Sequence, residues 1–352
     1  MRQESLSVLA ILTAAASLCA QGGELPRGGS APLPYTEDNI LGLDSFRSSL
    51  PAAQDPDYTM RGLFQQAHGD FMMKRERFDP KIKFTGEWMP TMSVDGEEGH
   101  FDLTTVAGDI EIPLMVSTDA YINVGAYGEG RYYNMDGFGG TPTPPIEPAG
   151  DEILSAIGAK LGVGWFASDD MLVEIQTEPG VWSDLDGTLH SDDYRFYSKA
   201  LLTWRTGDEF FFKIGARYNE VYKDAPYLPY LGFSWAIGET MRVDVLLPET
   251  AEFSFWPSGD TGFLFGLDIS GGRYEVRTSK ALGDTRDETY VQEIVVYAGM
   301  IFRLNDAMSL DFRGGAVVAG DYKWNTGQEG FNTIDGTLEP AAFLAASIGF
   351  DF

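Results

Sequence analysis

The sequence has almost no cysteine, and it has no long apolar run beyond its start. Of 352 residues only Cys19 is a cysteine, and it lies close to the N-terminus. If that segment is removed, the mature chain has no thiolate to act as a nucleophile or metal ligand. No later stretch approaches the roughly 18 consecutive apolar residues of a membrane-spanning helix. A secreted chain of this kind is periplasmic, extracellular or a membrane barrel.

Basic residues and histidines are also scarce. The chain has 25 Lys and Arg against 53 Asp and Glu, a formal net charge of −28. Because nucleic acids are bound through Lys and Arg that neutralise phosphates, we expect no nucleic-acid partner. The acidic excess is explained by solvated loops, with cation binding as the alternative. The sequence has no His/Cys cluster that would predict a zinc site, and we expect no metal centre and no cofactor.

The first 22 residues are typical of a secretory signal peptide. Arg2 precedes an apolar run from Leu6 to Ala20, and the small-x-small triplet that ends at Gly22 suits cleavage. Residues 23–78 then contain five prolines and show no period-2 pattern. We expect a periplasmic extension here, or a segment that folds back into a lumen as a plug. A loosely ordered linker is the alternative.

Residues 79–352 alternate between apolar and polar or small side chains. Phe210, Phe212 and Ile214 alternate with Phe211 and Lys213, and similar stripes recur in segments of about 10–15 residues. Since successive side chains of a strand point to opposite faces, each segment has one apolar face. The pattern predicts an all-β fold, an antiparallel transmembrane β-barrel of about 14 strands, with 12 as the alternative.

The connections between these segments alternate in length. Tight polar turns are expected at 117–119, 167–170, 206–208, 238–239, 257–260 and 305–306. Longer loops are expected at 93–99, 134–150, 183–191, 221–227, 279–287 and 323–337. The short connection at 248–250 is the exception. Short turns at one end and long loops at the other are the arrangement of outer-membrane barrels, with the turns on the periplasmic side.

Aromatic side chains gather beside the short turns, where a periplasmic aromatic girdle would lie. The girdle candidates are Trp165, Trp204, Phe210, Trp235 and Phe302. A soluble β-sandwich would use the same rings as core, but the apolar stripes have the length of a tilted transmembrane strand.

The last strand carries the most specific signal. Its apolar face comprises Ala342, Leu344, Ala346, Ile348, Phe350 and Phe352. This face resembles the terminal strand of bacterial outer-membrane barrel proteins. The resemblance implies that Phe350 and Phe352 form an insertion signal for the barrel assembly machinery. It also implies that outer-membrane lipid of a Gram-negative-type bacterium surrounds the barrel. The stretch Pro229–Trp235, followed by Leu247-Pro248, resembles an uncharacterised outer-membrane barrel family and implies no activity.

The polar faces of the strands are expected to line the lumen. The candidates are Arg195, Lys199, Lys213, Arg217, Glu174, Glu178, Arg242 and Asp244. A basic strip of this kind could attract an anionic solute and set selectivity. Alternatively, the same residues form cross-strand ion pairs that satisfy charges inside the barrel.

Three functions compete on this sequence. The leading hypothesis is a pore or transport barrel for small solutes, with luminal charge setting selectivity. The second is a structural or surface-recognition barrel with a blocked lumen. The third is a barrel-embedded hydrolase that uses His100 or His190, although no serine lies in a nucleophile-elbow motif. We expect no enzyme activity and assign no catalytic residue.

Overall fold

The computed structural model describes residues 60–68, 80–97, 99–136, 152–185, 189–219, 226–277, 286–305, 307–325 and 334–351. The chain divides into two units, Met1–Thr59 and Met60–Phe352, and all described residues belong to the second. The proposed signal peptide and most of the proposed extension at 23–78 therefore lie outside the described residues. Within the described part, no helix is long and apolar enough to cross a membrane.

The described residues form one α-helix, one 3-10 helix and fifteen strands. The helices are α3 (Met60–His68) and η3 (Ser191–Asp193). The first strands are β1 (Lys81–Ser93), β2 (His100–Met115), β3 (Ala120–Asp136), β4 (Glu152–Ser168), β5 (Met171–Ser183), β6 (Tyr194–Arg205), β7 (Phe210–Asn219) and β8 (Tyr227–Ile237). The remaining strands are β9 (Met241–Leu247), β10 (Thr250–Phe255), β11 (Thr261–Arg277), β12 (Arg286–Asn305), β13 (Met308–Asn325), β14 (Ile334–Thr337) and β15 (Ala341–Asp351).

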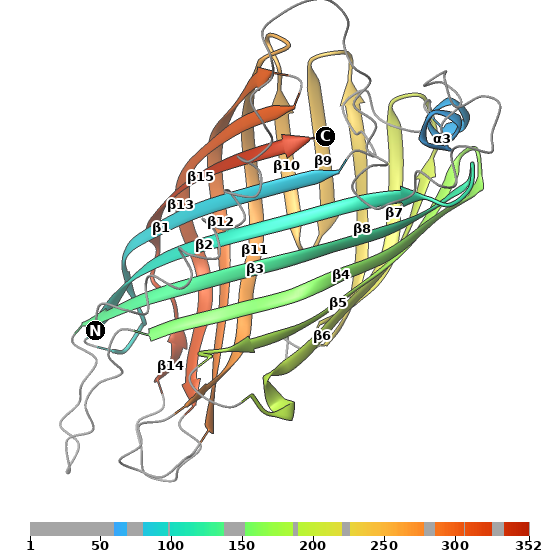
Figure 1. Cartoon of the computed structure of the whole chain (residues 1–352). Coiled ribbons are helices and arrows are strands. Elements are labelled where there is room, and N and C mark those ends of the chain that lie inside the picture. The colour runs from blue at the N-terminus through green and yellow to red at the C-terminus, as the bar shows by residue number, and fades with distance from the viewer. Residues whose placement is uncertain are drawn as a thin grey trace, which may run out of the picture. The chain divides into compact units, whose positions relative to one another are not determined.

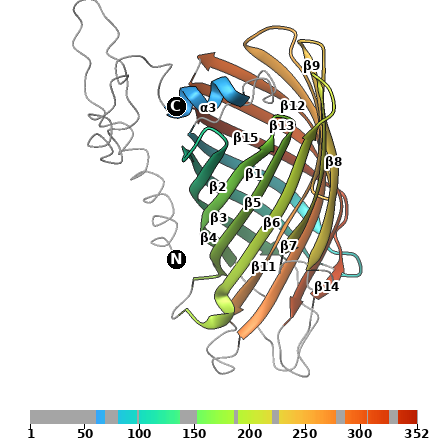
Figure 2. The ribbon, with the colours of Figure 1, turned by 90° about the vertical axis from the view of Figure 1, so that its right-hand side faces the viewer.

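The strands close into an antiparallel ring. Each strand from β1 to β13 pairs with its neighbour in sequence, and β15 pairs with both β13 and β1. Because β14 and β15 pair with successive parts of β13, they share one position, and the wall has fourteen strands. The predicted transmembrane β-barrel is confirmed. Figure 1 shows β1 to β6 crossing the front of the barrel, and Figure 2 shows their steep tilt.

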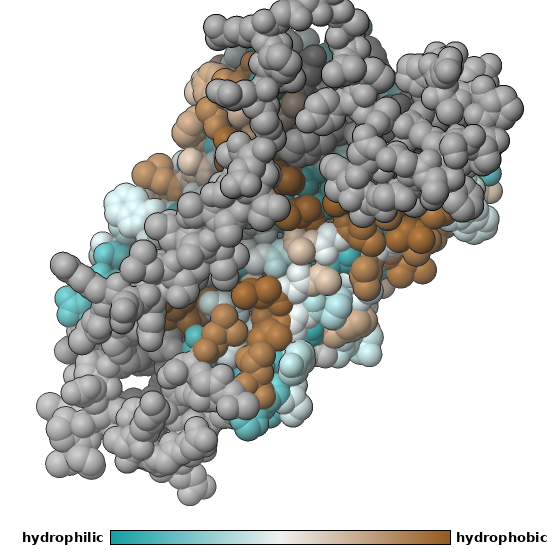
Figure 3. All heavy atoms as spheres, viewed as in Figure 1, coloured by the Kyte–Doolittle hydropathy of each residue, from teal (hydrophilic) through white to brown (hydrophobic). Residues whose placement is uncertain are grey.

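The two faces of the wall differ in chemistry. Directly paired residues share a face, so Val163, Ile175, Leu202, Ile214 and Leu231 lie on the same side of their strands. Most of this side is exposed and apolar, and Figure 3 shows apolar side chains on the visible wall. The other side carries charged residues and the buried cores. An apolar exterior around a polar interior is the architecture of bacterial outer-membrane barrels.

The wall has unequal height at the end that carries the long loops. The β12 strand has 20 residues, whereas β9 and β10 have only 7 and 6. The β9–β10 hairpin therefore ends well below its neighbours, at the short connection that the turn pattern had marked as exceptional. Above it β11 continues for nine residues, 269–277, without a partner in β10.

Candidate functional site

The lumen is the candidate functional site, and all eight predicted luminal residues lie on the inner face. Along each strand they alternate with the exposed apolar residues, so their side chains point to the opposite face. Glu174 and Glu178 lie on β5, Arg195 and Lys199 on β6, Lys213 and Arg217 on β7, and Arg242 and Asp244 on β9. Glu174 and Lys213 lie toward the short turns, whereas Arg195 and Arg217 lie toward the long-loop ends of β6 and β7.

Ion pairing changes the electrostatics of the predicted basic strip. Arg195 Nη2 lies 2.6 Å from Glu275 Oε1, and Arg217 forms an ion pair with Glu249. Arg242 Nη2 donates to Asp244 Oδ1 at 2.9 Å. These carboxylates offset the charge of the three guanidinium groups, which is the arrangement that the alternative of cross-strand ion pairs describes. Two of the partners, Glu249 and Glu275, come from outside the candidates that sequence patterning supplied.

The remaining candidates are less closely paired with groups of opposite charge. Lys213 Nζ lies 3.9 Å from Asp244, at the limit of an ion pair. Lys199 makes no ion pair with the residues that the structure describes, and it is half-buried. Glu174 accepts a hydrogen bond from Tyr121 Oη at 2.6 Å, and Glu178 accepts one from Gln176 Nε2 at 2.7 Å. Both donors are neutral groups and add no compensating charge, so the lumen is lined by acidic and basic side chains together.

The half of the lumen near the long loops is filled by aromatic and aliphatic side chains. Trp182 packs between Tyr197 and Tyr274, with ring centroids 5.1 and 5.3 Å away. Tyr127 lies against Gly158 and Gly180 of the wall. A Cβ at either glycine would fall within 2.6 Å of the Tyr127 phenol group, so the absence of a side chain there makes room for it. The same cluster extends over inward-facing residues of β1, β2, β12, β13 and β15. Among the described residues, this packing fills much of the lumen toward the long loops.

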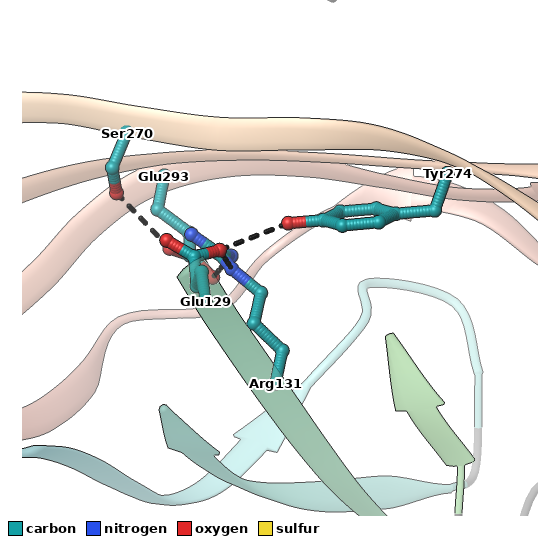
Figure 4. A network of polar contacts seen from close by, with 5 residues as sticks. All are labelled: Glu129, Arg131, Ser270, Tyr274 and Glu293. Atoms are coloured by element: carbon teal, nitrogen blue, oxygen red, sulfur yellow. Dashed lines mark hydrogen bonds and ion pairs between the residues drawn. The ribbon is translucent and has the colours of Figure 1, made fainter. Parts of the chain in front are cut away.

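A buried polar network lies inside this closed half (Figure 4). Arg131 Nε donates to Glu129 Oε1 at 2.7 Å, and Arg131 Nη1 lies 3.4 Å from both carboxylate oxygens of Glu293. Tyr274 Oη donates to Glu129 Oε1 at 2.9 Å, and Ser270 Oγ donates to Glu293 Oε2 at 3.2 Å. The network joins β3 to β11 and β12, which are not neighbours of β3 in the ring.

Sequence patterning missed this network. The only available signal was the single Glu293 between Val291 and Val295 on one face of β12. An acidic residue within an apolar stripe of a transmembrane strand needs a partner. Without knowing which strands meet across the lumen, that partner could not be named.

The helix α3 covers inward-facing rings at the short-turn end. Phe64 is 0% exposed and packs edge-on against Phe166 and Tyr121 at 5.6 and 6.0 Å. His68 stacks on Phe166 at 3.7 Å, and its Nε2 lies 3.2 Å from Asp119 Oδ1. Figures 1 and 2 show α3 at the upper end of the barrel as drawn, the end at which β15 finishes. The helix therefore lies at the mouth of the polar half of the lumen.

The docking of α3 should depend on Phe64. A nine-residue helix is marginal by itself, and truncation of a buried Phe typically costs about 3–5 kcal/mol. In a Phe64→Ala variant we expect fast amide hydrogen exchange over residues 60–68 and unchanged exchange in the strands. Met60→Ala, on the exposed face of the same helix, is the control. Equal protection in both variants would show that Phe64 does not hold the helix.

Comparisons with known proteins found similarity at the level of structure only. No family model matches the sequence, and no curated protein does. The toluene transporter TodX of P. putida is 10% identical, with a TM-score of 0.44 over 84% of this chain and 95% of that one. An outer-membrane channel from Pseudomonas putida F1 is 8% identical, with a TM-score of 0.40 over 79% and 97%.

A third similar structure is an autotransporter domain. The translocator domain of NalP from Neisseria meningitidis is 12% identical, with a TM-score of 0.35 over 83% of this chain and 95% of that one. At these identities and scores the likenesses carry no argument about function, which has to rest on the chain's own residues.

The predicted girdle residues lie on outward positions near the short turns. Trp165, Trp204 and Trp235 are exposed, and Phe210 pairs directly with Trp235. Phe302 lies on β12, where it pairs with Thr261 of β11 and Leu310 of β13. The five rings form the ends of five different strands, as an interfacial belt requires.

The proposed insertion signal is only half described. Phe350 lies in β15 and pairs with Ile82 of β1 and Met308 of β13, which closes the barrel seam. Phe352 lies outside the described residues, and the recognition role of this terminus stays a prediction.

The histidines of the hydrolase hypothesis occupy separate elements. His100 begins β2 and pairs with Ser93 and Asp136, while His190 precedes η3. Neither ring forms an ion pair with a carboxylate among the described residues.

Proposed function

We propose that the protein is an outer-membrane transport barrel for small polar solutes. The observation that carries this proposal is the charged inner face of the barrel wall. Lys83, Asp109, Lys160, Glu252 and Arg313 join the eight residues above on inward positions. So many charges on one face are favourable where water solvates them, as in a polar lumen.

The mixture of signs sets the selectivity that we expect. Lys160 forms an ion pair with Asp109, and Arg313 lies within 4.0 Å of Asp311, Asp268 and Glu252. The fields of two opposite charges at this spacing nearly cancel at the distance at which a hydrated ion passes. The proposed pathway therefore discriminates weakly between anions and cations.

Removal of one carboxylate should unmask the basic strip. A Glu249→Gln variant loses the ion pair between Arg217 and Glu249, and the lumen gains one unit of positive charge, which attracts anions. We expect the reversal potential under a KCl gradient to shift toward anion preference. Asp208→Asn, the same charge change in an exposed short turn, should shift it much less because salt screens that site over about 8–10 Å. Equal shifts of the reversal potential in the two variants would show that Glu249 does not line the pathway.

The same recordings test the proposed function itself. Planar-bilayer conductance, together with swelling of liposomes in small sugars or amino acids, should report solute passage. A complete absence of passage would contradict transport. It would favour a structural barrel, which the aromatic filling of the long-loop half supports.

A further inference from the structure

A cluster of charged side chains lies on the inner face of β10, β11 and β13. Its members are Glu252, Asp268, Asp311 and Arg313, and we call it the Arg313 cluster. Arg313 Nη2 lies 2.8 Å from Asp311 Oδ2 and 3.9 Å from Glu252 Oε2. Arg313 Nη1 lies 3.6 Å from Asp268 Oδ2. One guanidinium group is therefore shared among three carboxylates that come from both sides of β12.

Tyr297 of β12 holds two members of the cluster in place. It pairs directly with Gly266 of β11, where a Cβ would lie 2.5 Å from the Tyr297 hydroxyl oxygen. The missing side chain makes room for the phenol ring. Tyr297 Oη donates to Glu252 Oε2 at 2.9 Å, and Arg313 Cζ lies 4.7 Å from the centre of the Tyr297 ring. The ring thus orients one carboxylate and the guanidinium group together.

Each carboxylate of the cluster keeps one oxygen unused. The contacts above engage Glu252 Oε2, Asp268 Oδ2 and Asp311 Oδ2. Within the described residues, the second oxygen of each carboxylate accepts no hydrogen bond. Asp311 is only 8% exposed, and its Oδ1 is buried without a partner. Because a buried carboxylate oxygen without a donor is costly, the cluster lacks a hydrogen-bond donor.

The lumen gives a solute access to the cluster and supplies a separate positive charge. The Asp268 side chain is 39% exposed and that of Glu252 is 28% exposed. Lys83 of β1 is exposed on the same inner face, and its charge interacts with those of the four cluster residues. It forms no ion pair with any residue that the structure describes. Three carboxylates and two cations leave one excess negative charge, which favours a cationic group as the ligand.

We propose that the Arg313 cluster binds small solutes that carry both a primary ammonium group and a carboxylate, the chemistry of amino acids. A primary ammonium group has three N–H donors and no acceptor, which matches the unused oxygens of the three carboxylates. Lys83 receives the carboxylate of the solute. This inference rests on the proposed transport function, since it names the solute class of the same lumen.

Valine and glycine betaine test the role of the N–H donors. The two compounds are isomers and both are zwitterions, but the betaine nitrogen carries three methyl groups and no N–H. In liposomes that contain the wild-type protein, we expect valine at low concentration to pass about tenfold faster, the effect of one hydrogen bond to a charged group. Valine flux should also saturate. Equal flux of the two isomers would overturn the proposal and leave transport intact.

Glu252→Gln and Glu174→Gln form a matched pair of variants. Tyr121 donates to Glu174 across Gly164, as Tyr297 donates to Glu252 across Gly266, but Arg313 contacts Glu252 alone. We expect Glu252→Gln to bring the ratio of valine flux to betaine flux close to one. Glu174→Gln should keep the wild-type ratio. The same loss of ratio in both variants would show that luminal charge in general, and not the cluster, selects the solute.

Calorimetric titration of the folded barrel in detergent separates the site from transport. Valine should bind the wild-type protein, and Glu252→Gln should weaken that binding about tenfold. Lys83→Met should also weaken it, because the bound carboxylate loses its partner. Tighter binding in Lys83→Met would show that Lys83 itself fills the unused oxygens, and would overturn the proposal. Binding with this pattern but without any flux would support the site and contradict transport, whereas no binding of valine would overturn the site.

Discussion

Replacement of Ile214 with Arg is expected to lower the free energy of folding into lipid by about 2–4 kcal/mol, the penalty for a cation near the bilayer midplane. Ile214 is 46% exposed on β7, and its direct neighbours on the same face are Leu202 and Leu231. Among the described residues, the positions paired with Ile214 carry no carboxylate that could pair with the new charge. Urea-dependent refolding into lipid vesicles measures the change.

Gln176→Arg is the matched control, with the same new side chain on the inner face of β5. Gln176 is half-buried, and the neighbouring inward positions 174 and 178 are carboxylates, so the added charge gains partners. We expect a change below about 1 kcal/mol, as for solvated charges. Asn219 is a poor control although it also faces inward, because its side chain is 1% exposed and Arg would not fit. Equal penalties at 214 and 176 would mean that the assignment of faces is wrong.

Arg131→Met is expected to destabilise the barrel by about 3–5 kcal/mol, the usual effect of removing one partner from a buried ion pair. The change leaves Glu129 and Glu293 facing each other without a cation, and the Glu293 side chain is 1% exposed. Met preserves most of the side-chain volume, so the loss reflects charge rather than packing. The denaturation midpoint in lipid or detergent measures it.

A second substitution should reverse part of this loss. In Arg131→Met with Glu293→Gln, one uncompensated charge has been removed, and the amide still accepts from Ser270. We expect this double variant to be more stable than Arg131→Met alone. If Arg131→Met costs less than about 1 kcal/mol, water already solvates the network, and the long-loop half is not closed.

The strands of the wall could be predicted because one face of each strand contacts lipid and the other faces the polar lumen. Phe212 and Ile214 against Lys213 reveal the faces of β7 without knowledge of its neighbours. Turn lengths then order the strands, since antiparallel neighbours need only short connections. The count of about 14 followed from these local signals.

The interior was not predictable in the same way. Contacts such as Arg131 with Glu293 and Arg195 with Glu275 join positions 162 and 80 residues apart. They depend on which strands face one another across the lumen, and alternation does not encode that. The sequence contains the glycine pair at 271 and 272. Such a pair indicates that the strand can bend, but it does not predict the direction of the bend. The ion partners that neutralise the basic strip were therefore missed.

The short β9–β10 hairpin has a consequence for the lipid around the protein. Seven residues at about 3.4 Å each, tilted by about 40°, reach a height of about 18 Å. The apolar band of such barrels is about 25 Å tall, so one side of this wall is too short for the bilayer. Acyl chains beside β9 and β10 must compress, or the whole barrel must tilt toward that side. The protein would then thin the bilayer locally, and the surrounding lipid would be thinnest beside Phe253 and Val245.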